Sequence, residues 1–142
     1  MSELSMRVAR GSRFRSKLDG MNRARGAWLC LDCRAVWQER VKDCPTCDGE
    51  VKHFPSQREL KRAAALLLAE KAGAITGLKF HPRYPLIVNG RKVATYVADA
   101  SYVEDSLPVV EDTKPVGFMT PEARLRIDLF EACYAPLKVR IV

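Results

Sequence analysis

Four cysteines in two matched pairs constrain the first third of this chain. Cys30 and Cys33 form one Cys-x-x-Cys pair, Cys44 and Cys47 form the second, and ten residues separate the pairs. Each pair can bend into a knuckle that directs two thiolates at one ion, and two knuckles complete the tetrahedral ligand set that Zn2+ prefers. The spacing therefore predicts a zinc ribbon over roughly residues 27–50, with Zn2+ held by all four cysteines.

A site closed by four thiolates has no open coordination position, so we expect this zinc to stabilise the fold and not to catalyse. Disulfides are disfavoured in a cytosolic chain, and a redox role would need one pair at a helix start. His53 is an alternative ligand, but the four cysteines already complete the site. The fifth cysteine, Cys133, falls in the last predicted helix and is expected to be a buried core thiol.

Two predicted strands, over residues 92–99 and 107–113, form a second group of chemically active residues. Asp99 ends the first strand, and Asp112 and Lys114 end the second. Antiparallel pairing would bring these carboxylates to one edge of a sheet, where they repel each other unless a cation joins them. Carboxylate oxygens suit Mg2+ or Mn2+, and Lys114 would face the same side as Asp112. We therefore expect a metal-dependent phosphodiesterase site.

Asp99 followed by Asp112-Thr113-Lys114 resembles the D…(D/E)xK signature of the PD-(D/E)XK nuclease superfamily. Glu59 matches the helix glutamate that often completes that site. Residues 54–142 also resemble a small phage- and prophage-borne family of uncharacterised proteins placed in that superfamily. The shared segments are Ser56–Glu59, Lys71–Ile75, Tyr96–Asp99, Glu111–Lys114 and Val139–Val142. The departures, which are Ala98, Ala100 and Pro115, remove no ligand.

The resemblance implies an α/β fold with a restriction-endonuclease-like core, a mixed β-sheet flanked by helices, over residues 51–142. The zinc ribbon of residues 27–50 would be inserted in a hairpin of this core, after a basic arm and first strand over residues 1–26. Glu59, Asp99 and Asp112 would hold Mg2+ or Mn2+, and Lys114 would orient water or stabilise charge on the phosphate.

The activity that follows is that of a Mg2+-dependent DNA endonuclease, and a resemblance to phage resolvases implies branched or junction DNA as the substrate. A homodimer would fit cleavage of two strands. One alternative is a non-catalytic zinc-ribbon DNA-binding protein, and a second is a protein-interaction module that uses the ribbon.

Two glutamates near the predicted site need separate interpretation. Ser56-Gln57-Arg58-Glu59 is a capping box, in which Glu59 closes the start of a helix. The residues alone favour this cap, whereas the resemblance favours a ligand. Glu111 neighbours Asp112 on a strand and is expected to point to the opposite face.

The basic residues are unevenly distributed. The formal net charge is +7, and residues 1–26 hold seven basic residues against two acidic ones. Such an arm attracts polyanions, of which nucleic-acid backbones are the foremost candidates, although a solvated tail is the alternative. The expected DNA contacts are Arg13, Arg15, Arg23 and Arg25 in the arm, Arg40 and Lys42 in the ribbon, and Arg124 and Arg126 in the last helix.

The hydrophobic pattern predicts a helix over residues 56–72, with Leu60, Ala63, Ala64, Leu67 and Leu68 as its apolar stripe. Asn89-Gly90 predicts a hairpin turn, and Thr120-Pro121 predicts the start of the last helix. The sequence has no apolar run of membrane-spanning length and no secretory signal at its N-terminus. The expected location is the cytoplasm of a bacterial or phage-infected cell.

Overall fold

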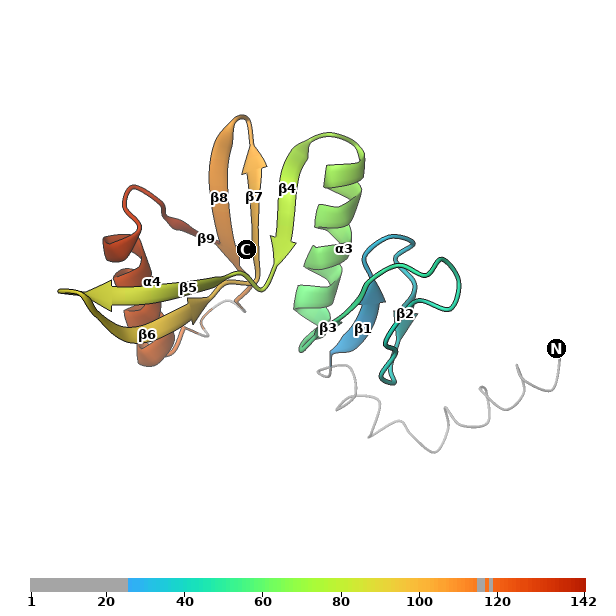
Figure 1. Ribbon diagram of the computed structural model, residues 1–142, viewed down its shortest axis with the longest axis horizontal. Helices are drawn as coiled ribbons and strands as arrows, with labels where there is room; N and C mark the ends of the chain where they lie inside the picture. The colour runs from blue at the N-terminus through green and yellow to red at the C-terminus, as the bar shows by residue number, and fades with distance from the viewer. Residues whose placement is uncertain (1–25, 115–116, 118) are drawn as a thin grey trace, which may run out of the picture. The chain divides into compact units, whose positions relative to one another are not determined.

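The computed structural model describes residues 26–114, 117 and 119–142. The strand predicted over residues 14–20 and the four arginines of the basic arm lie outside these residues. The described chain is a mixed α/β structure with two helices and three sheets (Figure 1). It divides into two compact units, and the division falls between Leu60 and Lys61 in the sequence. Neither helix is long and apolar enough to cross a membrane.

The first unit contains a small antiparallel sheet in the order β2-β1-β3. Its strands are β1 (Ala27–Cys30), β2 (Val36–Trp37) and β3 (Val51–Phe54). Ala27 pairs with Phe54 at the open end of the sheet. A side chain at Gly26 would collide with the main-chain carbonyl of Phe54, so this close approach of the two strands requires glycine.

Helix α3 (Gln57–Lys71) confirms the predicted helix over residues 56–72. The Ser56 hydroxyl accepts a hydrogen bond from the Glu59 main-chain N–H at 3.2 Å, which is one half of the predicted capping box. The predicted apolar stripe is wrong in detail, because Leu66 is buried with Leu60 and Ala63 whereas Leu68 is 49% exposed. The buried face is rotated toward Arg62, which forms an ion pair with a strand of the second unit's sheet.

The second unit contains a four-stranded sheet in the order β4-β7-β8-β9. Its strands are β4 (Ile75–Phe80), β7 (Ala100–Glu104), β8 (Leu107–Asp112) and β9 (Val139–Ile141). The pairs β4–β7 and β7–β8 are antiparallel, and β9 lies parallel to β8. The predicted pairing of residues 92–99 with residues 107–113 is therefore wrong. The partner of β8 is β7, a strand that the sequence analysis missed because the chain bends between β6 and β7.

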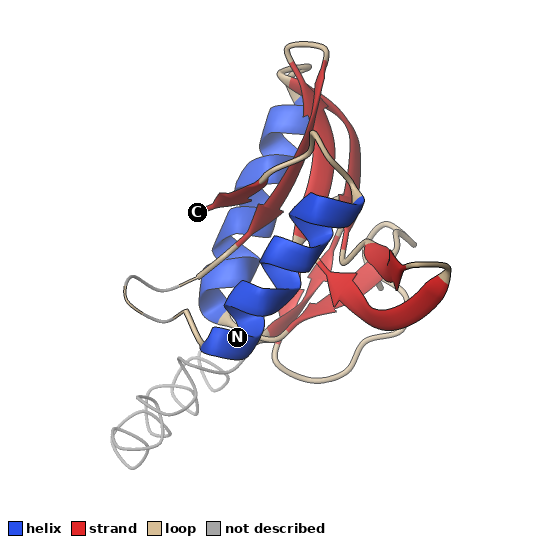
Figure 2. Cartoon of the chain, turned by 90° about the vertical axis from the view of Figure 1, so that its left-hand side faces the viewer, coloured by secondary structure: helices blue, strands red, loops and turns tan. Residues whose placement is uncertain are grey.

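A separate two-stranded sheet pairs β5 (Arg83–Val88) with β6 (Arg91–Val97) through the predicted Asn89-Gly90 turn. Both turn residues have positive φ, 50° and 77°, as a tight hairpin with this dipeptide requires. Figure 2 shows the strands in red and the helices in blue.

Helix α4 (Pro121–Cys133) packs on β5 and β6. The Thr120 hydroxyl accepts a hydrogen bond from the Ala123 N–H at 3.1 Å, which confirms the predicted cap. The buried cluster beneath the helix consists of Leu86, Tyr96, Ala98, Val110, Ile127 and Phe130. Cys133 is exposed, with its Sγ 3.4 Å from the Ile87 carbonyl oxygen, so the prediction of a buried core thiol is wrong.

Glu111 is the centre of a buried polar network on one face of β8. It is fully buried, and Arg62 donates to both of its carboxylate oxygens, from Nε at 2.8 Å and from Nη2 at 3.0 Å. The Tyr102 hydroxyl donates to Glu111 at 2.8 Å and accepts from Arg140 Nη1 at 3.2 Å. The hydrogen bonds with Glu111 raise the pKa of Arg62, so the guanidinium stays charged. This network joins α3, β7, β8 and β9.

Replacing Arg62 by alanine would leave the Glu111 carboxylate buried without its cation. We expect Arg62→Ala to lower the free energy of unfolding by about 3 kcal/mol, at the low end for a broken buried pair because Arg62 is partly exposed. Chemical denaturation of the zinc-loaded protein measures this loss. The double variant Arg62→Met/Glu111→Leu should lose less, since it buries no unpaired charge. A loss below about 1 kcal/mol in the single variant would show that the pair behaves as a surface salt bridge.

Candidate functional site

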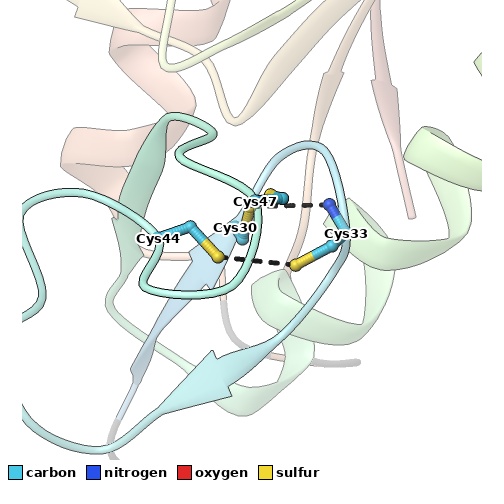
Figure 3. A group of neighbouring side chains, drawn as sticks. All are labelled: Cys30, Cys33, Cys44 and Cys47. Atoms are coloured by element: carbon cyan, nitrogen blue, oxygen red, sulfur yellow. Dashed lines mark hydrogen bonds between the residues drawn. The ribbon is translucent and has the colours of Figure 1, made fainter.

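The four cysteines of the first unit form one cluster (Figure 3). All four Sγ atoms lie within 4.8 Å of one another, with Cys30 and Cys47 at 3.5 Å and Cys33 and Cys44 at 3.5 Å. A Zn–S bond of about 2.3 Å in a tetrahedron places the sulfurs roughly 3.8 Å apart, so the cluster has the size of a zinc site. The donor set and its geometry both fit Zn2+.

The two knuckles of this cluster have the same main-chain hydrogen bonds. The bonds are Cys30 N–H to Ala35 O at 2.9 Å, Arg34 N–H to Cys30 O at 3.1 Å, Cys44 N–H to Gly49 O at 3.1 Å and Asp48 N–H to Cys44 O at 3.0 Å. The residue after the second cysteine of each pair has positive φ, 64° at Arg34 and 58° at Asp48. The repeated Cys-x-x-Cys pattern therefore folds into two equivalent turns, which is how the spacing alone could predict the cluster.

The thiols of Cys44 and Cys47 differ in acidity in the absence of a cation. Burial opposes ionisation of Cys44, but the main-chain N–H groups of Cys47 and Thr46 outweigh it and lower the pKa of Cys44 to about 6. The N–H of Gly49 favours the Cys47 thiolate, yet the hydrogen bond with Cys30 and burial raise the pKa of Cys47 to about 12. Because zinc binds thiolates, loading the site at neutral pH must displace protons from thiols such as that of Cys47.

The second unit carries the predicted carboxylates at a place where the chain changes sheets twice. It leaves β4 at His81 to enter β5, and it leaves β6 at Ala98 and Asp99 to enter β7. Two hydrogen bonds join these crossings, from the His81 N–H to Asp99 O at 3.0 Å and from the Ala98 N–H to Pro82 O at 3.2 Å. Asp99 is thus held at a bend that both sheets share.

Asp99 lies directly beside the Asp112-Thr113-Lys114 segment. The Thr113 N–H donates to Asp99 Oδ2 at 2.6 Å, and the Asp99 N–H donates to the Glu111 carbonyl oxygen at 3.1 Å. Strand β9 holds the other side of this segment, because the Lys114 N–H donates to Val142 O at 3.1 Å. The structure therefore places the Asp112-Thr113-Lys114 segment beside Asp99, although the pairing of β6 with β8 that was expected to do this is absent.

Asp112 is a buried carboxylate with two partners. It is 4% exposed, its Oδ2 lies 3.2 Å from Lys114 Nζ, and the Tyr96 hydroxyl donates to the same oxygen at 3.3 Å. Burial and the negative charge of Asp112 raise the pKa of Tyr96, so this hydroxyl stays protonated as a donor. Glu111 points to the opposite face of β8, toward Arg62, as the alternation of a strand predicts.

Among the described residues, the Thr113 hydroxyl is buried without a hydrogen-bond partner. Buried polar atoms are almost always paired with protein or with ordered water, so an orphan is a feature that needs explanation. Thr113 is 7% exposed and lies between Asp112 and Lys114 in the segment that carries the candidate site. A hydrated or liganded site next to this segment would satisfy the hydroxyl.

His81 and Tyr96 are polar neighbours of the candidate site that the sequence analysis did not assign to it. A ring nitrogen of His81 lies within 4.8 Å of an Asp99 carboxylate oxygen. His81 lies in the loop between β4 and β5 before Pro82, and the sheet crossing places it beside Asp99. Tyr96 was recognised as part of a shared segment, but its bond to Asp112 depends on how β6 packs beside β8.

The predicted DNA-binding residues that the structure describes are exposed. Arg40, Lys42, Arg124 and Arg126 all belong to this class. Arg124 forms an ion pair with Asp128 one turn later on α4, with Nε and Oδ1 3.6 Å apart and both side chains more than half exposed. Glu59 lies in the first turn of α3, in the first unit. The arginines of the arm lie outside the described residues.

Zinc retention should depend on the four clustered cysteines and on pH. We expect Cys44→Ser to lose stoichiometric zinc, and acidification below about pH 6 to release zinc from the wild type, because protons compete with the metal for thiolates. Metal analysis after dialysis at a series of pH values measures both effects. Cys133→Ser is the matched control and should keep its zinc. Stoichiometric zinc in Cys44→Ser would contradict the four-cysteine site.

Comparison with known proteins gives one family. A family model described as "Protein of unknown function (DUF1064)" matches residues 46–142, which is more than half of the chain. The match covers β3, both helices and all later strands, and it begins between Cys44 and Cys47. Searches of curated proteins and of solved structures found no match. The chain therefore belongs to the DUF1064 family.

Proposed function

We propose that the protein is a metal-dependent DNA endonuclease of the PD-(D/E)XK type, with a restriction-endonuclease-like core. The observation that carries this proposal is the placement of Asp99 beside Asp112-Thr113-Lys114 by the Thr113 N–H hydrogen bond. Two segments far apart in sequence thus supply two carboxylates and an amine to one place. Such a set suits hydrolysis of a phosphodiester, which needs a cation site and a positive charge near the phosphate.

Asp99 and Asp112 would hold Mg2+ or Mn2+, and the cation would act as a Lewis acid on a phosphate oxygen. The carboxylate oxygens of the two aspartates are the hard ligands that such a cation prefers. Lys114 would place its ammonium group near the scissile phosphate, and the 3.2 Å contact with Asp112 orients it. Tyr96 would fix the Asp112 carboxylate by donating to Oδ2.

Glu59 is our candidate for the third carboxylate. It matches the helix glutamate that often completes a PD-(D/E)XK site. The capping bond uses the main-chain N–H of Glu59, so the cap and a ligand role for its carboxylate are compatible.

DNA is the proposed substrate because of the charge distribution. The basic arm carries most of the surplus of +7. The ribbon together with β3 is nearly balanced, since residues 27–54 contain four lysines and arginines and five acidic residues. Electrostatic attraction to a phosphate backbone therefore comes mainly from the arm, and the ribbon would add local contacts through Arg40 and Lys42. By analogy with phage resolvases, we propose branched DNA as the substrate. A homodimer would suit such a substrate, because it could cleave two strands.

The nuclease proposal predicts cleavage that needs a divalent cation and the site residues. We expect wild type to cut at least one of linear, flap and four-way-junction DNA with Mg2+ or Mn2+ but not with EDTA. Asp112→Asn and Lys114→Ala should each lower the rate at least about a hundredfold, because each removes a charge that acts in the transition state. Gel assays at fixed protein concentration measure the rates.

Glu104→Gln is the matched control, since this carboxylate pairs with Arg140 at the other end of β7. It should cut at the wild-type rate, and all variants should keep zinc and their circular dichroism spectrum. DNA binding without cleavage of any substrate by the wild type would contradict the endonuclease.

A second candidate function is a zinc-ribbon protein that binds DNA without cutting it. The observation that favours it is that Asp112 already has Lys114 and Tyr96 as partners, so a cation is not needed to stabilise it. This alternative predicts DNA binding that is indifferent to Mg2+ and to Asp112→Asn.

The contribution of the ribbon to DNA binding can be measured separately. We expect Arg40→Ala/Lys42→Ala to weaken DNA binding and to reduce the slope of log affinity against log salt concentration by up to about 2, because each cation releases about one counterion. Fluorescence anisotropy across a salt series measures the slope, with zinc content checked. An unchanged affinity and slope would remove the ribbon from the DNA interface.

A further inference from the structure

His81 is placed by the fold at the same crossing as Asp99. The loop between β4 and β5 is so tight that His81 has a positive φ of 53°, which is uncommon for a residue other than glycine. Its main-chain N–H donates to the Asp99 carbonyl oxygen at 3.0 Å. Both residues are half-buried. The main chain therefore fixes the two residues next to each other before any ligand is present.

The side chains of this pair are also close. A ring nitrogen of His81 and a carboxylate oxygen of Asp99 lie within 4.8 Å, a separation that allows one cation to contact both atoms. The Thr113 N–H donates to Oδ2 of Asp99 and orients the carboxylate from the opposite segment. A neutral imidazole is a common metal ligand in proteins.

We propose that His81 supplies a nitrogen ligand to the cation that Asp99 anchors, and that the site consequently selects Mn2+ over Mg2+. This inference rests on the proposed function, because it takes the cation site at Asp99 as given. Mg2+ prefers oxygen ligands and keeps its water, whereas a mixed nitrogen and oxygen set favours a transition metal. The chain contains two histidines, His53 and His81, and His53 lies on β3 in the zinc ribbon.

Electron spin-echo spectroscopy of Mn2+ bound to the zinc-loaded protein tests the ligand directly. A coordinated imidazole gives nitrogen modulation of the Mn2+ echo, and labelling histidine with 15N should change that modulation in the wild type. We expect His81→Gln to abolish the modulation and to lower Mn2+ affinity roughly tenfold, with a much smaller change for Mg2+. His53→Gln is the matched control and should keep both the modulation and the affinity.

The outcomes of this experiment test the histidine ligand and the cation site separately. Nitrogen modulation that persists in His81→Gln would overturn the inference. Wild-type Mn2+ that binds in an Asp99-dependent way without histidine modulation would also overturn it, while leaving the proposed cation site in place. Mn2+ binding that is absent, or unaffected by Asp99→Asn, would contradict the cation site itself and with it the proposed nuclease. The wild-type spectrum decides the ligand even if a variant fails to fold.

Discussion

The hydrogen bond from the Thr113 N–H to the Asp99 carboxylate is the contact on which the candidate site depends. Asp99 lies where the chain passes from the two-stranded sheet to the four-stranded sheet, and Thr113 follows the last residue of β8. Without this contact the two carboxylates would belong to separate strand ends. With it, the bend at Ala98 and Asp99 becomes the corner at which Asp99, Asp112, Lys114 and His81 gather.

The side chains of β8 alternate between a buried ion pair and the candidate site. Glu111 faces α3 and is neutralised by Arg62 and Tyr102, so its charge serves the fold. Asp112, the next residue, faces Tyr96 and Lys114. One acidic pair in sequence therefore has two different roles, and a loss of activity at either position means something different. Only Asp112 is a candidate ligand.

Local patterns predicted the local structure well. The cysteine spacing predicted the cluster correctly, because each knuckle is closed by hydrogen bonds within a few residues. The Asn89-Gly90 turn and the Thr120 cap were also predictable, because they too depend on neighbouring residues in the sequence. The pairing of β8 with β7 was missed because residues 100–104 were not recognised as the strand that precedes the Asp105-Ser106 turn. The rotation of α3 and the exposure of Cys133 were missed because they depend on contacts between distant segments. The proximity of Asp99 to Asp112 was expected on the wrong strand pairing, and His81 could be placed only by the fold.

The most direct test of the cation site is anomalous diffraction from crystals of the zinc-loaded protein soaked in Mn2+. We expect a zinc peak among the four clustered cysteines, which serves as an internal standard. We also expect a manganese peak within coordination distance of both Asp99 and Asp112 oxygens. A zinc peak without manganese at Asp99 and Asp112, at a Mn2+ concentration that supports DNA binding, would contradict the metal-dependent site.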